Sequence, residues 1–360
     1  MDKKLLDQII EQYPVLSDRV EIKRIDSGYI NDTFQLIDLN NERKYILQRI
    51  NAEVFIEVNL TMNNIDLITT HIQSKLDVDT DIYKYRNIKY LYSKRGLNYI
   101  EVADHSKWRI CDFIDNYPPD LSNKSQIAKE TGKILAYFHA LTDDFNIDNL
   151  VETITDFHNI IVRWRILKNV VELNNKRFQD TIYIYEEILN HQYLIDRFDQ
   201  IMKKGNIPLK VVHNDPKIDN FLFDDNNEAL CLIDLDTAMP SYRPIDFGDS
   251  IRSLCNTAVE DEKDMDKVSF DMDIFKSFTR SYLSISEKFL SNNEKSNLAI
   301  FSILITFEQA LRFYTDFLSG DIYYKIQYPE QNLIRTKVQL KLLRSMISKY
   351  EEMKLFISQH

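Results

Sequence analysis

The sequence predicts an α+β fold in which a small antiparallel β-sheet lobe is followed by a larger, mainly helical lobe. Segments in which apolar and polar residues alternate are concentrated before residue 115, around one helical segment at 58–76. After residue 124, apolar residues recur mainly at helical spacing. Tyr117-Pro118-Pro119 interrupts the pattern between these regions, so we expect an N-terminal lobe at 1–116 and a C-terminal lobe at 117–360.

The small lobe is expected to begin with an amphipathic helix at 1–10, because its apolar residues fall on one face and charges interrupt them. Alternating patterns then predict strands at 20–25, within 27–37, and at 44–50, 88–92, 98–102 and 108–114. The last three of these segments are expected to complete a five-stranded antiparallel pattern, with the final strand leading into the hinge between the lobes.

In the larger lobe, apolar periodicity predicts helices at 125–141, two within 160–204, and one each near 271–288, 293–318 and 330–356. Residues 260–267 are acidic and are expected to form a surface loop. Two short apolar runs flank the turn-forming residues 224–227 and predict a β-hairpin at 221–233.

Composition excludes several classes of protein. The chain has 360 residues, of which 44% are hydrophobic and 28% charged, and a formal net charge of -11, so it lacks the basic surface that nucleic acids or anionic membranes attract. The apolar runs fall short of the ~18 residues that a membrane span needs. Three widely spaced cysteines in apolar contexts, Cys111, Cys231 and Cys255, indicate reduced thiols in a cytoplasmic protein.

The stretch around the predicted hairpin carries the chemistry. His213-x-Asp215-x4-Asn220 precedes it, and its second strand ends in Asp234. Because the ends of a hairpin lie side by side, Asn220 and Asp234 should be neighbours. Phosphoryl transfer needs a carboxylate to accept the proton of the attacking hydroxyl, and an Asn and an Asp to hold Mg²⁺ against the phosphates. The stretch supplies all three groups.

These motifs resemble the catalytic loop of the aminoglycoside phosphotransferase and choline kinase superfamily, whose members share a bilobal protein-kinase-like fold. The longer segments are similar to those of N-acetylhexosamine 1-kinases: His213-Asn214-Asp215-Pro216-Lys217, residues 233–240 and Asp246-Phe247-Gly248-Asp249. This resemblance extends from about residue 20 to residue 340. It implies ATP and Mg²⁺ as cofactors, and as product the 1-phosphate of N-acetylglucosamine or N-acetylgalactosamine.

Roles in catalysis follow from the resemblance. Asp215 is expected to be the base, and Asn220 and Asp234 are expected to bind the metal. Lys217 is interpreted as a point charge on the transferring phosphoryl group, with a solvated loop lysine as the alternative. His213 is included in the catalytic set, where it is expected to support the loop.

Asp246-Phe247-Gly248 has the same letters as the protein-kinase magnesium motif, but its position argues against that role. The metal-binding Asp of protein kinases follows the catalytic Asn by about one hairpin, which fits Asp234. Asp246 and Asp249 lie later, so we expect them to support the loop or the start of the helix that contains Arg252.

The nucleotide is expected to contact the small lobe. Gly28, Asn31 and Thr33 lie in a strand-turn-strand segment that resembles a phosphate-covering loop, although an ordinary hairpin turn is the alternative. The strand at 44–50 lacks the lysine that grips phosphates in kinases. Arg49 or Gln48 is expected to replace it, with Arg49 preferred for its charge. Hinge backbone from Cys111 to Asp115, with Asp112 and Phe113 at its centre, is the expected adenine contact.

The acceptor is expected to contact Asp215, Asp236, His158, Arg312 and Tyr323. Asp236 is interpreted as a sugar contact or a second metal ligand. His158 lies in Asp156-Phe157-His158-Asn159, a segment that resembles one in the sugar kinases, and a capping Asp beside a packed aromatic residue is the alternative. For Arg312, the alternative is an ion-pair ladder with residues 308 and 316 along one helix face.

The leading hypothesis is therefore an ATP- and Mg²⁺-dependent kinase for the C1 hydroxyl of N-acetylhexosamines, a small-molecule enzyme without nucleic-acid or membrane partners. One alternative is a related kinase for choline, another amino alcohol, another sugar or an aminoglycoside. The other is a non-catalytic nucleotide-binding protein. The sequence does not predict an oligomeric state.

Overall fold

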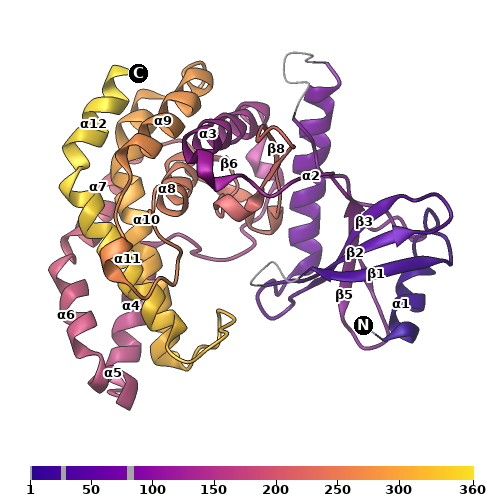
Figure 1. The fold of residues 1–360 in the computed structure, drawn as a ribbon, viewed down its shortest axis with the longest axis horizontal. Coiled ribbons are helices and arrows are strands. Elements are labelled where there is room, and N and C mark those ends of the chain that lie inside the picture. Colours follow the sequence, from indigo (N-terminus) through magenta and orange to yellow (C-terminus); the bar gives the residue numbers. More distant parts are fainter. Residues whose placement is uncertain (1, 26–29, 79–84) are drawn as a thin grey trace.

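The structure is a computed structural model that describes residues 2–25, 30–78 and 85–360. It shows an antiparallel sheet with two helices at one end and a larger helical region at the other (Figure 1). The predicted α+β fold is confirmed. The division into lobes at residues 116 and 117 stays a prediction, although the sheet ends before it and the helical region begins after it.

The sheet contains five strands in the order β1-β2-β3-β5-β4, and all neighbours are antiparallel. Their bounds are β1 Val20–Ile25, β2 Asp32–Asp38, β3 Lys44–Ile50, β4 Ile100–Glu101 and β5 Lys107–Asp112. The predicted strand at 88–92 is wrong, because this segment makes only an isolated bridge from Tyr90 to Cys111. The strand predicted at 98–102 is reduced to two residues.

One helix lies against each face of the sheet. Helix α1, Lys3–Ile10, buries Ile9 in an apolar cluster that also contains Leu47. The opposite face meets α2, Val58–Leu76, where Met62 lies 3.5 Å from Nη1 of Arg109. Because side chains alternate along a strand, the α2 face of β3 carries Gln48 and the α1 face carries Leu47. The polar side of the sheet therefore faces the rest of the molecule.

The larger region contains the following helices: α3 Lys124–Leu141, α4 Ile160–Glu172, α5 Lys176–Asp180, α6 Ile182–Asn190, α7 Tyr193–Lys204, α8 Arg243–Leu254, α9 Met272–Ser286, α10 Asn292–Ser319, α11 Gln331–Ser348 and α12 Tyr350–Gln359. Two predictions are corrected. Residues 160–204 form four helices instead of two, in part because the Asn175 side chain caps α5 by accepting from Phe178 N. The segment at 330–356 is divided at Lys349 between α11 and α12.

Two small antiparallel pairs lie among these helices. Strand β7, Phe221–Phe223, pairs with β8, Ala229–Leu232, as the predicted hairpin. Strand β6, Lys210–Val212, pairs with β9, Met239–Ser241. Residues 213–238 contain the predicted catalytic residues and are called the catalytic segment below. This segment connects the two pairs, because it leaves β6, enters β7, returns through β8 and reaches β9. The two strand pairs thus fix the backbone on both sides of the candidate site residues.

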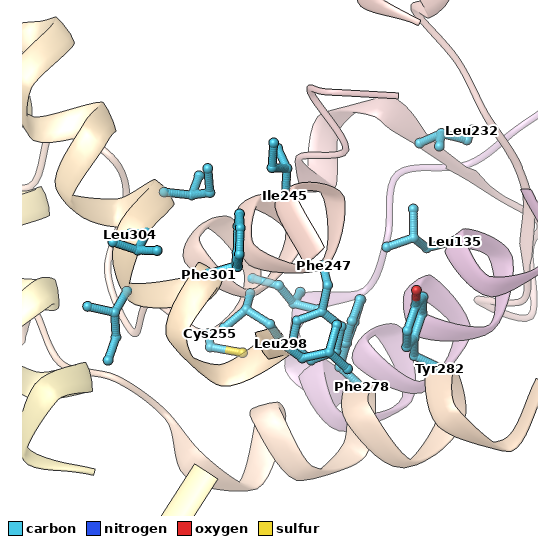
Figure 2. Packing of buried hydrophobic residues seen from close by; sticks show 14 of the residues in the cluster. Leu135, Leu232, Ile245, Phe247, Cys255, Phe278, Tyr282, Leu298, Phe301 and Leu304 are labelled. Carbon is cyan, nitrogen blue, oxygen red and sulfur yellow. The ribbon is translucent and has the colours of Figure 1, made fainter. Parts of the chain in front are cut away.

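The core of the larger region is formed by α3, α8, α9 and α10. Phe247, Phe278, Tyr282, Leu298 and Phe301 pack together within it (Figure 2). Within the described residues, α10 is the one helix that is long and apolar enough to span a membrane, but 83% of its apolar window is buried inside the protein. It is therefore the central core helix of this region. All three cysteines are buried and free, as expected.

Gly132 on α3 marks a close approach to α9, and it supports a stability prediction. A Cβ at this position would lie 2.4 Å from the backbone carbonyl oxygen of Phe278. Gly132→Ala is therefore expected to lower the free energy of unfolding by about 3 kcal/mol, the upper part of the range for overpacking. Urea unfolding measures this, with the exposed Lys129→Ala on the same helix as control. Equal stability of the two variants would contradict the close packing.

Candidate active site

The catalytic segment begins directly after β6 and holds Asp215 at the surface of the core. The side chain of Asp215 is 30% exposed and forms an ion pair with Lys217. Its Oδ2 atom also accepts a hydrogen bond of 3.1 Å from Nδ2 of Asn220. Burial raises the pKa of Asp215, but the charge of Lys217 outweighs this effect and the pKa is lowered. Asp215 is therefore ionised at neutral pH and able to accept a proton.

The hairpin brings Asn220 and Asp234 together, as the sequence predicts. The Ile233 amide donates to the carbonyl oxygen of Asn220 at 2.8 Å, so the residues at the two ends of the hairpin are adjacent. Asp234 adopts a left-handed backbone conformation with φ of 66°, which turns the chain at the end of β8. The site thus places a carboxylate, an amide and a second carboxylate side by side.

The electrostatics of Asp234 fit a cation-binding role. Burial and the negative charges of Asp236 and Asp215 raise its pKa to about 6, although Lys217 and Arg109 oppose this effect. Asn220 donates its amide hydrogens to Asp215, which leaves its side-chain oxygen without a hydrogen bond from the described residues. Oxygen donors beside an excess of negative charge suit Mg²⁺.

Other metal arrangements were not found in the part of the chain that the structure describes, since no group of three His, Cys, Asp or Glu side chains converges there. An amide oxygen and one carboxylate leave most of the octahedral positions of Mg²⁺ to water and phosphate oxygens, as is usual for nucleotide-bound magnesium. Asn220 and Asp234 therefore fit the ion that the resemblance implies.

Asp246 supports the catalytic segment from α8, as expected, and does not face the metal position. Its carboxylate is completely buried and accepts hydrogen bonds of 2.7 Å from the backbone amides of both His213 and Asn214. It also bonds Nε2 of His139 at 2.9 Å. Burial lowers the pKa of His139, so this imidazole is neutral and donates to Asp246. Asp249 instead pairs with Arg252 at 2.7 Å.

His213 has a positioning role, which corrects its inclusion among the catalytic residues. The side chain is fully buried, and its Nε2 bonds the carbonyl oxygen of Ile233 at 2.8 Å. Its Nδ1 accepts from the Asp215 amide at 3.2 Å. Both ring nitrogens are used inside the protein, so His213 connects the base to the end of β8 and does not meet a substrate.

His158 also supports the loop, which corrects the expectation that it contacts the acceptor. Its Nε2 donates to the carbonyl oxygen of Asn214 at 2.7 Å, and its Nδ1 donates to Glu308 at 2.8 Å. Burial lowers the pKa of His158, but the charge of Glu308 outweighs this and raises it. The imidazolium thus links α10 to the residue before Asp215. The alternative of a capping Asp is wrong, because the cap of α4 is Asn159, whose side chain donates to the carboxylate of Asp156 at 2.7 Å.

Arg312 lies among aromatic rings near the base. Its guanidinium carbon is 4.7 Å from the ring centroid of Phe157, 5.8 Å from that of Tyr323 and 5.9 Å from that of Tyr324. We call these four residues the Arg312 cluster. Within the described residues, the Arg312 guanidinium has no hydrogen-bond acceptor. Burial opposes the charge of Arg312, but the nearby tyrosines, Glu308 and Asp215 raise its pKa, so the cation persists.

The ion-pair ladder proposed as the alternative for Arg312 does not form. Glu308 pairs with His158 and lies 3.8 Å from Arg163. Asp316 accepts from the backbone amides of residues 322, 323 and 324 and from Asn332, and so holds the turn after α10. This turn carries Tyr323 and Tyr324 to Arg312. Tyr324 was not predicted, and Phe157 was considered only as part of the segment around His158, because it lies far from Arg312 in the sequence.

On the nucleotide side, the structure does not place Arg49 at the site. Arg49 is exposed and pairs in register with Trp108, whose side chain lies in the cluster beneath α1. Gln48 lies on the other face, where it donates to Thr33 at 3.2 Å and accepts from Nε of Arg109 at 2.9 Å. Of the two predicted replacements for the lysine, only Gln48 faces the larger region.

The carboxylate of Asp236 is engaged by Arg109 and by Asn31, which corrects the expectation that Asp236 contacts the sugar. Both carboxylate oxygens of Asp236 accept from Arg109, and Oδ2 also accepts from Asn31 at 2.7 Å. The Asp236 side chain is 3% exposed. Arg109 was missed because no local motif marks it.

The hinge amides at the centre of the predicted adenine contact are already bonded. Asp112 N donates to the carbonyl of Lys89 at 2.9 Å, and Phe113 N donates to that of Lys44 at 3.3 Å. These two N–H groups are therefore not presented to a nucleotide. Gly28 lies outside the described residues.

Asp234 supports a prediction that separates activity from stability. Its pKa is raised from 3.8 to about 6 on folding, so ionisation of Asp234 lowers the free energy of unfolding. This loss of stability is absent below pH 4 and complete above pH 6. Asp234→Asn removes this charge. At pH 7 it is expected to raise the free energy of unfolding of the metal-free protein by about 3 kcal/mol, since one pKa unit corresponds to about 1.4 kcal/mol.

Thermal unfolding with and without Mg²⁺ at pH 4.5 and pH 7 measures this effect. The gain in stability of Asp234→Asn over the wild type is expected to be smaller at pH 4.5 than at pH 7. Mg²⁺ with ATP is expected to stabilise the wild type more than the variant. If Asp234→Asn is less stable than the wild type at pH 7, the ionised carboxylate of Asp234 does not destabilise the native state, and the prediction is contradicted.

A sheet lobe, a helical lobe, and a catalytic segment with adjacent Asp, Asn and Asp side chains define a kinase-like small-molecule phosphotransferase. Residues 21–267, more than half of the chain, match the model of the phosphotransferase enzyme family, so the chain belongs to this family. Membership agrees with the superfamily that the catalytic motifs resemble.

Solved structures of similar fold agree. The chain is similar to an aminoglycoside phosphotransferase from Alicyclobacillus acidocaldarius, with a TM-score of 0.66 and 13% identity over 100% of this chain and 97% of that one. For a spectinomycin phosphotransferase in complex with ADP and spectinomycin, the TM-score is 0.62, with 13% identity over 98% and 99%. For a choline kinase from Cryptosporidium parvum, it is 0.60, with 16% identity over 99% of both chains. These likenesses establish the fold.

Proposed function

We propose that the chain uses ATP and Mg²⁺ to phosphorylate the anomeric hydroxyl of N-acetylhexosamines, giving the sugar 1-phosphate. In this proposal Asp215 accepts the proton of the C1 hydroxyl as its oxygen attacks the γ-phosphorus in line. Asn220 and Asp234 hold Mg²⁺, which neutralises negative charge on the phosphates when it is bound. Lys217 holds the base in place and lies close enough to contact the transferring phosphoryl group.

The Arg312 cluster is the observation that carries the choice of acceptor. It combines three aromatic rings, of which Tyr323 is 37% exposed, with a guanidinium that lacks hydrogen-bond acceptors within the described residues. His158, next to Phe157, connects the cluster to the residue before Asp215. Aromatic rings suit the apolar face of a sugar ring, and the N–H groups of Arg312 suit hydroxyl or acetamido oxygens. A neutral, oxygen-rich acceptor satisfies both features.

Cationic acceptors fit this arrangement poorly. Choline carries a permanent positive charge, and aminoglycosides carry several ammonium groups at neutral pH. A second arginine, Arg163, lies 3.8 Å from Glu308, which is already paired with His158. A cation placed beside Asp215 would be repelled by Arg312 without a free carboxylate in this group to offset it.

The acceptor is tested by coupled ADP release with MgATP against N-acetylglucosamine, N-acetylgalactosamine, glucose, galactose and choline. Turnover is expected on the N-acetyl sugars. In Arg312→Met, the KM for the N-acetyl sugar is expected to rise about 10- to 100-fold, as for the loss of charge-assisted hydrogen bonds, with a smaller change in the KM for ATP.

The matched control is Arg165→Met, which removes an exposed arginine on α4 and is expected to leave both KM values unchanged. Turnover on choline but not on the sugars would contradict the proposed acceptor. So would an Arg312→Met variant with an unchanged KM for its acceptor.

A further inference from the structure

A row of polar side chains crosses the face of the sheet that meets the larger lobe. Thr33 on β2 is the register partner of Gln48 on β3, and Gln48 is the register partner of Arg109 on β5. Hydrogen bonds connect the row, from Gln48 to Thr33 at 3.2 Å and from Arg109 to Gln48 at 2.9 Å. A sheet face that is polar across three adjacent strands indicates a functional surface, because it gives up apolar packing there.

Arg109 ends this row as a buried cation directed at the catalytic segment. Its side chain is 1% exposed, and Nη1 and Nη2 both donate to the carboxylate of Asp236, with Nη2 at 3.0 Å from Oδ2. Nε donates to Gln48, and Nη1 also contacts the sulfur of Met62 at 3.5 Å. One N–H of Nη2 therefore has no acceptor within the described residues. Arg109 is therefore held in a fixed position, and this remaining N–H group is available to a ligand.

The position of Asp236 places Arg109 next to the proposed metal ligand. Asp236 follows Asp234 by two residues in a single turn, and the guanidinium of Arg109 is bonded to both carboxylate oxygens of Asp236. Phosphates held by a metal on Asp234 must therefore lie near Arg109. The other arginine considered for this task, Arg49, is exposed on the opposite face.

We infer that Arg109 is the cation that binds the phosphates of the nucleotide, and that Asp236 orients it. This inference rests on the nucleotide-dependent part of the proposed function. In protein kinases a lysine on the third strand binds the phosphates and a glutamate on the neighbouring helix holds that lysine. Here Gln48 occupies the third strand, the cation comes from β5, and its carboxylate partner comes from the turn after the catalytic hairpin.

This arrangement has a consequence for the coupling of the two lobes. The carboxylate that orients the cation lies in the same turn as the metal ligand Asp234, instead of on α2. Formation of the phosphate-binding group therefore requires the sheet and the catalytic segment to be in contact. A planar guanidinium also binds a carboxylate and a phosphate oxygen through separate N–H groups, which a lysine ammonium does with less directional control.

Nucleotide binding to the full chain, measured by calorimetry without any acceptor, tests the inference. The ligands are MgATP, ADP and adenosine, since only adenosine lacks phosphates. Removal of Arg109 alone leaves Asp236 buried and unpaired, so the test variant is the double substitution Arg109→Met with Asp236→Asn, which leaves neither charge behind. Arg109→Lys keeps a cation, and Arg49→Met is the matched arginine control.

The double variant is expected to bind MgATP and ADP about 10- to 100-fold more weakly and adenosine within about 3-fold of the wild type, as for the loss of charge-assisted hydrogen bonds. Arg109→Lys is expected to recover part of the lost affinity, Asp236→Asn alone to give a smaller phosphate-selective loss, and Arg49→Met to match the wild type.

An equal loss for all three ligands would overturn the inference, because it would assign Arg109 a purely structural role. Unchanged affinity for MgATP would also overturn it. Because no acceptor is present, a wrong choice of acceptor leaves this test unaffected. If the wild type itself binds no nucleotide, both the inference and the proposed function are wrong, whereas a failed acceptor assay with normal ATP binding removes only the latter.

Discussion

Replacing Asp215 by asparagine is expected to lower kcat by a factor of about 10³ or more while the protein stays folded and binds MgATP with nearly unchanged affinity. The substitution keeps the shape of the side chain and removes the carboxylate that accepts the proton. Asp215 is 30% exposed, so its loss leaves no buried cavity. The effect should therefore fall on the chemical step.

Coupled ADP release under saturating substrates measures this loss, and calorimetric titration with MgATP checks nucleotide binding. Asp219→Asn is the matched control, because Asp219 is an exposed aspartate in the same loop and is expected to be dispensable. Asp215→Ala should behave like Asp215→Asn. If Asp215→Asn retains more than about a tenth of the wild-type kcat, Asp215 is not the base.

Replacing Asp246 by alanine is expected to lower the free energy of unfolding by about 3–5 kcal/mol. This is the range for removing one partner from a buried, hydrogen-bonded charged pair. The carboxylate is 0% exposed and accepts from two backbone amides and from His139. Its loss leaves these donors buried without a partner. The catalytic segment should then lose its fixed position, and activity should fall with stability.

This result distinguishes the two readings of Asp246-Phe247-Gly248. If Asp246 were a metal ligand, its removal would spare the fold and raise the Mg²⁺ concentration needed for activity. Chemical denaturation of Asp246→Ala beside Asp234→Asn makes the comparison directly. We expect Asp246→Ala to be destabilised and Asp234→Asn to be stable but inactive. An Asp246→Ala variant as stable as the wild type would contradict its assigned role.

Features encoded within a short stretch of sequence could be predicted. His213, Asp215, Asn220 and Asp234 fall within 22 residues, and a hairpin turn fixes how its two ends meet. Hydrophobic periodicity likewise located α2 and α3, because each buries one continuous face. These elements depend on local spacing, which a single sequence contains.

Features that depend on distant pairing were missed or misassigned. Arg109 and Asp236 are 127 residues apart, and only the order in which β5 joins β3 brings them together. The bond between His158 and Glu308 spans 150 residues, so the sequence suggested a helix ladder for Glu308 instead. Strand alternation separated Gln48 from Arg49 correctly but did not reveal which face meets the larger lobe. Charge alone then favoured the wrong residue.

The position of the transferred phosphate tests the central claim most directly. The protein is incubated with MgATP and N-acetylglucosamine or N-acetylgalactosamine, and the product is examined by phosphorus and proton NMR. Coupling of phosphorus to the anomeric proton, absent with Asp215→Asn, is the predicted result and identifies a sugar 1-phosphate. Coupling to protons at another carbon, or no phosphorylated sugar although ATP binds, would contradict the proposed reaction.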